Sequence, residues 1–294
     1  MIRGARAGWP RRRAFGLTGA AFGGALFGFI CAAVYLGPFL WRVDPAYLDL
    51  LARNAGPSAA HPLGTDELGR DILARVLAGG RISITVGLTA MLLSVGLGTA
   101  LGLLAGFYRR LDGVLMRLTD LFLALPLLPL LLVLVTLFRD SLTRFIGAEA
   151  GLFTLIVVAI GLTSWMQTAR IVRADVLALK ERDFVLAARS GGARDARLIT
   201  RHILPNVLSP IVVSATLGMA NAIITESALS FLGLGFPPDF ATWGRLLADA
   251  VLYLQEYPGR AFWPGLAISL TVLSVNALGD GLRDRLDPRT RARI

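Results

Sequence analysis

The sequence is poor in the residues from which most catalytic and metal sites are built. Its 294 residues include one cysteine (Cys31), one lysine (Lys180) and two histidines (His61 and His202). A single cysteine permits no intrachain disulfide and no cysteine cluster for a metal ion. Lys180 follows a leucine rather than the glycine that precedes the lysine of a phosphate-binding P-loop, so ATP hydrolysis by that route is excluded for this chain.

Charged residues are scarce as well. They make up 17% of the chain and hydrophobic residues 55%, whereas a soluble domain has about 25% charged and about 45–50% apolar residues. Six stretches carry no charge, and each has close to the roughly 20 residues that a helix needs to cross the hydrocarbon core. These stretches are 14–41, 82–108, 121–138, 150–169, 203–225 and 261–279. We therefore expect an all-α polytopic membrane protein with six transmembrane helices.

The first uncharged stretch follows three arginines, Arg11, Arg12 and Arg13, and so has the basic flank of a signal peptide. Its 28 residues exceed the apolar run of about 7–15 residues that a signal peptide has. No Ala-x-Ala-like cleavage site stands at its end. We expect this stretch to remain as a membrane anchor.

The arginines predict the orientation of the chain, because positive residues favour the cytoplasmic side of a membrane. With a cytoplasmic N-terminus, 21 of the 30 basic residues lie inside, in segments 1–13, 109–120, 170–202 and 280–294. The other nine lie outside, in segments 42–81, 139–149 and 226–260. Both termini are therefore predicted to be cytoplasmic. The net charge of +10 is spread between apolar spans, which argues against nucleic acid as a partner.

The predicted spans divide the chain into two parts. Residues 1–81 form an N-terminal segment with the first transmembrane helix and an extracytoplasmic shelf. In this shelf Thr65 or Asp66 is expected to cap a helix that ends at Gly79-Gly80. Residues 82–294 form the membrane core. Its spans are expected at about 82–108, 114–138, 150–169, 205–227 and 261–280, with a cytoplasmic loop at 174–204.

Glycines repeat every four residues in the second span, at Gly98, Gly102 and Gly106. This spacing lets two helix backbones approach closely in lipid. The alternative is that glycine is simply common in membrane helices. The sequence alone leaves both interpretations open.

The longest inside segment, 170–202, is too polar to enter lipid and too long for a simple connection between helices. Val176–Ser190 is expected to form a helix that Gly191-Gly192 breaks. A second short helix over about 193–203 is expected to stop at Pro205. The two helices could form a rigid knob that enters a partner's groove. The alternative is a hairpin that lies on anionic lipid headgroups through its arginines.

This segment resembles the EAA loop of the membrane subunits of bacterial ABC importers. Ala187-Ala188, Gly192 and Leu204-Pro205 stand at matching positions. Two positions depart: Leu186 replaces the glutamate of that loop, and His202 stands where its isoleucine is expected. The resemblance implies that the loop couples the chain to an ATPase. The residues implied to do so are Phe184, Leu186, Ala187, Ala188, Arg189, Gly192, Leu204 and Pro205.

The wider chain, about 40–294, resembles the C-type permease subunits of the dipeptide, oligopeptide and nickel importers. The motifs are His61–Asp66 with Leu68–Asp71, Arg201–Asn206, Glu226–Gly235 and Gly279–Arg289. The resemblance implies a type I ABC importer transmembrane domain in the bacterial plasma (inner) membrane. It also implies four partners: a second permease subunit, two ATP-binding cassette subunits and an extracytoplasmic solute-binding protein. No cofactor is expected in this chain; ATP and Mg²⁺ are expected in the ATPase subunits.

Few polar residues lie within the spans. Asn221, Glu226 and Asn276 could line a pathway or bond a neighbouring helix, and counting from Val207 puts Glu226 near the outer interface. No catalytic set and no metal site is expected, because His61 and His202 are predicted on opposite sides of the membrane.

The sequence therefore predicts a membrane-spanning permease subunit of an ATP-driven importer for di- or oligopeptides or related small solutes. The main alternative is a secondary transporter or channel without ATPase partners. A membrane-embedded enzyme is disfavoured, because no histidine lies in the spans to activate a nucleophile.

Overall fold

The computed structural model describes residues 12–237 and 240–286. The described part is almost entirely helical, and its one β-bridge joins Thr65 to Asp71. Residues 1–11 and the end of the C-terminal motif, 287–289, lie outside the described residues. The helices are α1 (Arg12–Leu40), η1 (Leu50–Ala52), α2 (Ile72–Phe107), α3 (Arg109–Ala124), α4 (Leu127–Ile146), α5 (Ala148–Leu162), α6 (Met166–Leu179), α7 (Asp183–Ser190), α8 (Asp195–Arg197), the π-helix η2 (Leu198–Ile203), α9 (Leu204–Phe231), α10 (Trp243–Val251) and α11 (Gly259–Leu286).

The predicted all-α membrane fold is confirmed. Four stretches of helix are long and apolar enough to cross a bilayer: Gly19–Leu40, Ile72–Phe107, Asp195–Phe231 and Gly259–Arg285. Two further spans are bent pairs, α3 with α4 at 90° and α5 with α6 at 41°. The described part of the chain therefore reaches the six predicted spans when each bent pair counts as one.

The third span, expected over 114–138 with a kink at Pro126 and Pro129, is broken rather than kinked. It breaks between α3 and α4, where Leu125 adopts an extended conformation (φ −80°, ψ 134°) directly before Pro126. A residue that precedes proline is driven out of the helical region by the proline ring, and proline has no N–H for the helix to use. The break therefore follows from the local sequence.

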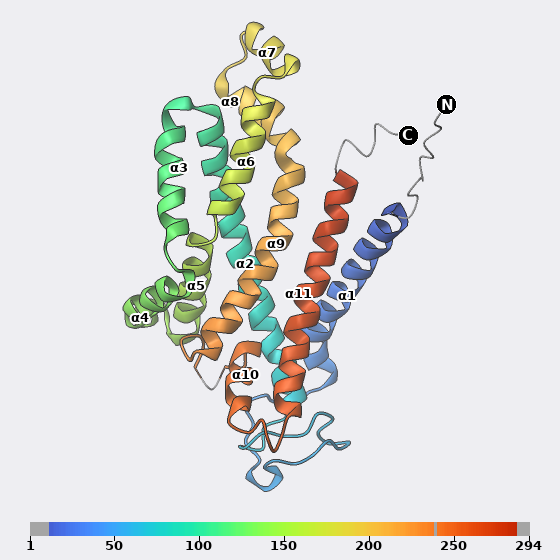
Figure 1. Cartoon of the computed structure of the whole chain (residues 1–294). Helices are drawn as coiled ribbons and strands as arrows, with labels where there is room; N and C mark the ends of the chain where they lie inside the picture. Colours follow the sequence, from blue (N-terminus) through green and yellow to red (C-terminus); the bar gives the residue numbers. More distant parts are fainter. Residues whose placement is uncertain (1–11, 238–239, 287–294) are drawn as a thin grey trace, which may run out of the picture.

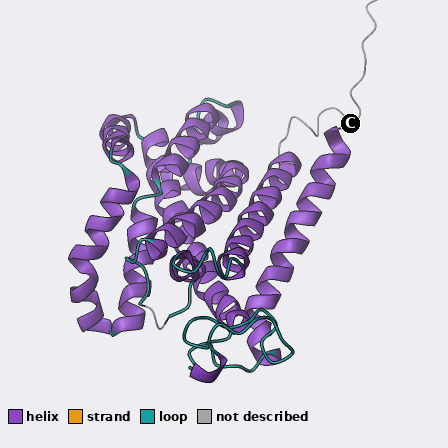
Figure 2. Ribbon diagram, turned by 60° about the horizontal axis from the view of Figure 1, so that its bottom comes forward, coloured by secondary structure: helices purple, strands orange, loops and turns teal. Residues whose placement is uncertain are grey.

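The two ends of the molecule carry different segments. In Figure 1, α7 and the start of α3 lie at one end, beside the start of α1 and the end of α11, while the loop before α2 and α10 lie at the opposite end. Figure 2, seen from the loop side, shows that long loops gather over this second end of the helices. The described parts of the segments predicted to be cytoplasmic thus share one end, and those predicted to be outside share the other.

Of the two interpretations of the glycines in the second span, close packing is the one that the structure shows, between α2 and α6. A Cβ atom on Gly98 or Gly102 would stand 2.6 Å from the carbonyl oxygens of Trp165 or Ala169, and one on Gly106 would stand 2.6 Å from Cβ of Val176. Real Cβ atoms do not come this close to neighbouring atoms. The glycines therefore let the C-terminal part of α2 lie directly against α6.

The shelf preceding α2 differs from the prediction. The cap is Asp71, whose side chain accepts from the backbone N–H of Ala74 at 2.7 Å, and neither Thr65 nor Asp66 caps a helix. The helix runs on through Gly79 and Gly80 to Phe107, so the division expected at 81/82 lies inside α2. These two glycines face α10: a Cβ on Gly80 would stand 2.7 Å from the ring of Trp243, and Gly79 touches the backbone of Thr242. They serve close packing rather than helix termination.

Candidate functional site

The loop between α6 and α9 forms a small helical knob, which we define as residues 180–203. The expected helix Val176–Ser190 is in fact two helices, because α6 ends at Leu179 and Arg182 takes an extended conformation (φ −80°, ψ 146°) before α7 begins. Gly192, at φ +82°, then reverses the chain. An L side chain rarely adopts this conformation, so the turn depends on glycine at this position.

The second half of the knob also differs from the prediction. The helix that begins at α8 does not stop at Pro205; it passes through η2 into α9 without a break. Pro205 occupies the first turn of α9. Proline has no N–H for a regular α-helical hydrogen bond, and the π-helical stretch η2 just before it is where the helix departs from regular α-helical bonding. The knob is therefore continuous with the fifth span.

The knob is fixed to three spans by its inner face. Val185, 1% exposed, packs in an apolar cluster with Phe107 of α2, Val176 of α6 and Val207 of α9. The guanidinium of Arg189 lies over the ring of Phe107, 5.6 Å from its centroid. A displacement of α7 is therefore expected to move the ends of α2, α6 and α9 with it, because packed interiors transmit strain.

Hydrogen bonds and an ion pair reinforce this attachment. Lys180 Nζ donates to the carbonyl oxygen of Gly106 at 3.1 Å. Arg173 of α6 forms a two-pronged ion pair with Asp112 of α3, with Nη2 2.7 Å from Oδ2. α3, α6 and the knob are thus joined at one corner.

The structure divides the predicted coupling residues into two groups. Ala188 and Leu204 pack, half-buried, against the apolar cluster and hold the knob in place. The others are exposed at the end of the molecule: Phe184, Leu186, Ala187, Arg189, Gly192 and Pro205. The sequence analysis missed Val185, which the apolar period of α7 could have shown, and Lys180, whose partner is 74 residues away.

A cavity of about 320 Å³ lies between the spans, at the two places where helices break. Its walls come from α2, α6 and α9 together with the bends between α3 and α4 and between α5 and α6. The lining side chains are apolar or neutral and polar, and none is charged. The polar ones are Ser94, Thr163, Ser164, Gln167, Thr168, Ser214, Asn221 and Thr225.

The three polar residues singled out in the spans have different surroundings. Asn221 lines this cavity, but Glu226 and Asn276 are not among its lining residues. Glu226 is fully buried, and α9 continues five residues beyond it to Phe231. Its carboxyl accepts hydrogen bonds from Ser83 Oγ of α2 at 2.9 Å and from Ser230 Oγ at 2.7 Å. Glu226 therefore ties α9 to α2.

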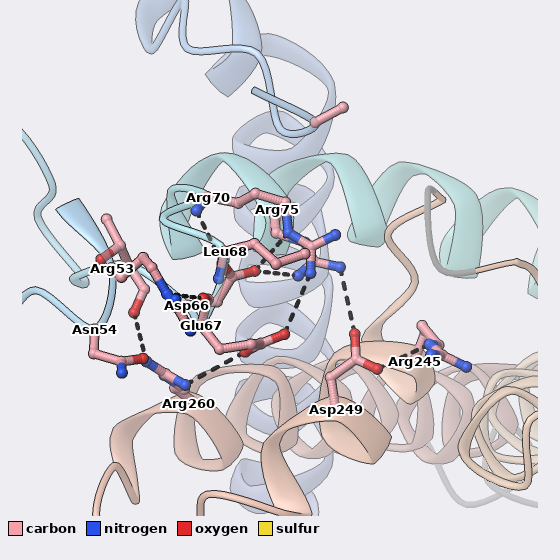
Figure 3. A network of polar contacts seen from close by, with 12 residues as sticks. Arg53, Asn54, Asp66, Glu67, Leu68, Arg70, Arg75, Arg245, Asp249 and Arg260 are labelled. Atoms are coloured by element: carbon pink, nitrogen blue, oxygen red, sulfur yellow. Dashed lines mark hydrogen bonds and ion pairs between the residues drawn. The ribbon is translucent and has the colours of Figure 1, made fainter. Parts of the chain in front are cut away.

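An ion-pair network holds the outer end of the molecule together (Figure 3). Asp66 accepts from Arg70 Nε at 2.7 Å and from Arg75 Nη1 at 2.5 Å, and Arg75 also lies 3.5 Å from Asp249 of α10. Burial alone would raise the pKa of Asp66, but Arg75 and Arg70 outweigh it, so this pKa lies below its usual value. The shelf, α2 and α10 are fixed to one another by these charges.

The two histidines lie at opposite ends of the molecule, as predicted. His61 Nδ1 lies 2.9 Å from Asp71 Oδ2 in the shelf, whereas His202 is in η2 of the knob. Among the described residues no group of three or more histidines, cysteines or carboxylates could hold a metal ion.

Known proteins are similar in sequence to this chain over most of its length. Residues 98–292 match the family described as "Binding-protein-dependent transport system inner membrane component". The chain is 42% identical to the oligopeptide transport system permease protein OppC of Bacillus subtilis over 86% of this chain and 80% of that protein. It is 39% identical to the dipeptide transport system permease protein DppC of Alkalihalophilus pseudofirmus, over 90% and 83%. It is 40% identical to a putative peptide transport system permease protein of Brucella suis, over 96% and 90%.

Proposed function

The chain belongs to the family of inner membrane components of binding-protein-dependent transport systems, and on this premise we propose that it imports peptides as the permease subunit of an ATP-driven ABC importer. The similar proteins from Bacillus, Alkalihalophilus and Brucella are named for peptide transport, which supports this class of solute. The cavity agrees with such a solute: its neutral hydroxyls and amides can bond a peptide backbone and impose no preference for one side-chain charge.

The observation that carries the proposal is the attachment of the knob. Its exposed outer face is free for an ATPase subunit, while Val185, Lys180 and Arg189 fix its inner face to α2. When the ATPase subunits close on ATP, they would push the knob as a rigid body. Spans α2, α6 and α9, which wall the cavity, would then rock and open it to one side of the membrane or the other.

The proposed assembly follows because transport and ATP hydrolysis are assigned to different subunits. The chain has no P-loop lysine, so two partner subunits would hold ATP and Mg²⁺ and supply the energy. A second, related permease subunit would complete the pathway, and a solute-binding protein would deliver the peptide to the shelf end. We place the complex in the bacterial inner membrane, with residues 82–294 as the importer core.

The test uses the complete complex in lipid nanodiscs. Gly192→Val forces a branched side chain into φ +82° and should abolish the stimulation of ATP hydrolysis by solute and binding protein. Gly191→Val is the matched control, because Gly191 has φ −75° and an added Cβ there meets nothing closer than 3.4 Å. Normal stimulation in Gly192→Val would contradict the role of the knob. Transport by the chain without ATPase subunits would instead favour a secondary transporter.

A further inference from the structure

Two helix breaks leave backbone carbonyl groups without partners at the wall of the cavity between the spans. At the break between α3 and α4, the helical partner of the Leu125 carbonyl oxygen would be the N–H of residue 129, but Pro129 has none. At the break between α5 and α6, the carbonyl oxygens of Thr163 and Ser164 have no partner either. No hydrogen bond from a described residue reaches any of the three oxygens. Because Leu125, Thr163 and Ser164 all line the cavity, three acceptors are available at one site.

These acceptors lie within the membrane-spanning part of the chain. Except for Ile171, every residue that lines the cavity falls in one of the uncharged stretches 82–108, 121–138, 150–169 and 203–225. An unpaired backbone group is strongly unfavourable in hydrocarbon, so irregular backbone at this depth must be buried in protein or line a cavity that holds water or a solute. The carbonyl groups at the two breaks therefore take their hydrogen-bond donors from the contents of the cavity.

Two buried hydroxyl groups at the same cavity also lack partners. Ser94 of α2 is 4% exposed and Thr168 of α6 is 5% exposed. Both residues line the cavity, and within the described part of the chain neither hydroxyl forms a hydrogen bond. Most polar side chains that are buried to this degree are hydrogen-bonded. A solute in the cavity would supply the missing partners.

The electrostatic character of the site comes from helix ends, because none of the lining side chains is charged. α3 ends at Ala124 and α5 at Leu162, directly before the residues with unpaired carbonyl groups. The C-terminus of a helix carries about half a negative elementary charge, so these two ends favour a cation that donates hydrogen bonds. α6 begins at the second break, and the N–H groups of its first turn can donate to a carbonyl oxygen of the same solute.

We infer that the cavity binds the N-terminal ammonium group of a peptide through the carbonyl oxygens of Leu125, Thr163 and Ser164. The inference rests on the proposed function and specifies the part of the solute that the permease recognises. An ammonium group has three N–H donors and no acceptor, which suits a set of carbonyl oxygens. Every peptide with a free amino end carries this group whatever its side chains are. Recognition by the permease is therefore independent of the peptide sequence.

A sodium ion is the other cation that backbone carbonyl groups bind. The size of the cavity favours the peptide. Its volume of about 320 Å³ is far larger than a single ion needs and lies at the lower end of the range of about 300–1,000 Å³ that small-molecule sites have. The unpaired hydroxyls of Ser94 and Thr168 extend the polar wall to other elements, as a solute with several polar groups requires.

The first test measures the binding of tri-alanine to the complex of permease and ATPase subunits in nanodiscs, without the solute-binding protein, by saturation-transfer NMR. N-acetyl-tri-alanine lacks the ammonium group and should bind about tenfold more weakly or worse, because hydrogen bonds from a charged donor are the stronger ones. Tri-alanine amide keeps the ammonium group and should bind within about threefold of tri-alanine. Equal binding of the acetylated and the free peptide would overturn the inference, as would displacement of tri-alanine by sodium chloride but not by choline chloride.

The second test removes the first break. The double variant Pro126→Ala with Pro129→Ala restores the N–H of residue 129, so the Leu125 carbonyl gains a partner within a continuous helix. The ratio of affinities for free and acetylated tri-alanine should fall to within about threefold. Pro38→Ala, which removes a proline from α1 away from the cavity, is the matched control and should keep the wild-type ratio. A wild-type ratio in the double variant would overturn the inference.

The failure of this inference can be distinguished from the failure of the proposed function. Transport is measured with the complete complex, including the solute-binding protein. If the complete complex transports no peptide, the proposed function fails. If it transports tri-alanine while the complex without the binding protein does not distinguish the free from the acetylated peptide, only the ammonium site is wrong.

Discussion

Lys180, the only lysine of the chain, donates a hydrogen bond from Nζ to the carbonyl oxygen of Gly106, 3.1 Å away. This bond joins the start of the knob to the end of α2, one turn before the bend into α3. Because a carbonyl at a helix C-terminus has no helical partner, a cation there stabilises the helix end. The contact therefore connects the knob, to which the ATPase is proposed to bind, with α2, which forms part of the cavity wall.

Removal of this joint should weaken coupling without preventing assembly. Lys180→Met keeps the aliphatic stem but loses the hydrogen bond, which is worth about 1.5–3 kcal/mol when one partner is charged. We expect a several-fold loss of solute-stimulated ATP hydrolysis with normal recovery of the complex. Arg110→Met, a change of the same kind on the exposed face of α3, should leave the stimulation intact. Equal solute-stimulated ATP hydrolysis by Lys180→Met and the wild type would show that this hydrogen bond does not contribute to coupling.

The seam between α2 and α6 should tolerate no larger side chain. Gly102→Val would drive Cβ to within 2.6 Å of the Ala169 carbonyl and 2.8 Å of Val172 Cβ, and overpacking of this kind costs about 1–3 kcal/mol. We expect a clear fall in the midpoint of thermal unfolding in detergent. Gly96→Val on the same helix meets nothing within 4 Å and should leave the midpoint nearly unchanged. Equal midpoints for the two variants would contradict the close approach of α2 and α6.

Asp66 should make the outer network sensitive to acid. Its pKa is lowered on folding, so its contribution to stability is complete above its ordinary pKa of 3.8 and is lost as the pH falls through the lower folded value. Asp66→Asn removes the carboxylate that two buried guanidinium groups share, which leaves Arg70 only Glu67 at 3.6 Å and Arg75 only Asp249 at 3.5 Å, and should destabilise the protein by about 3 kcal/mol. Thermal unfolding between pH 7 and pH 3 checks both expectations. Asp44→Asn, at an exposed position, serves as the control, and a variant Asp66→Asn as stable as the control would contradict the network.

Glu226 should act by its shape and hydrogen bonds. Glu226→Ala leaves the hydroxyls of Ser83 and Ser230 without their acceptor and opens a cavity between α2 and α9, which together should cost about 2–5 kcal/mol. Glu226→Gln keeps an acceptor and the volume, so most of the stability should remain. Thermal unfolding separates the two variants. Normal stability of Glu226→Ala with loss of transport would indicate a pathway role instead.

The membrane fold could be predicted because lipid imposes a strict demand on the sequence. A helix that crosses the hydrocarbon core must be about 20 apolar residues long. The uncharged runs that contain Gly23, Ile84 and Ser274 have this length, and they form α1, α2 and α11. The arginines gave the orientation for a similar reason. The size of the bend before Pro126 could not be predicted, since proline ends the helix but the packing of α4 on α5 sets its direction.

The site was harder to predict wherever distant partners decide the local structure. Asp66 and Asp71 are equally good helix caps by sequence, but Arg70 and Arg75 bind the former, which leaves Asp71 to cap α2. Likewise, Glu226 is enclosed by Ser83, 143 residues earlier in the chain. Gly192 could be predicted, because a reversal between two short helices depends on local backbone preference alone.

The most direct test of the account identifies the subunit that contacts Ala187, which is exposed on the knob. In a complete complex with Cys31→Ala, a sulfhydryl-reactive photo-crosslinker on Ala187→Cys is activated during ATP turnover, and the captured subunit is identified by mass spectrometry. Leu51→Cys, fully exposed in the shelf at the opposite end, is the matched control. The account predicts that Ala187→Cys captures an ATPase subunit and that Leu51→Cys does not. Capture of the solute-binding protein from Ala187→Cys, or of no subunit while ATP is hydrolysed, would contradict it.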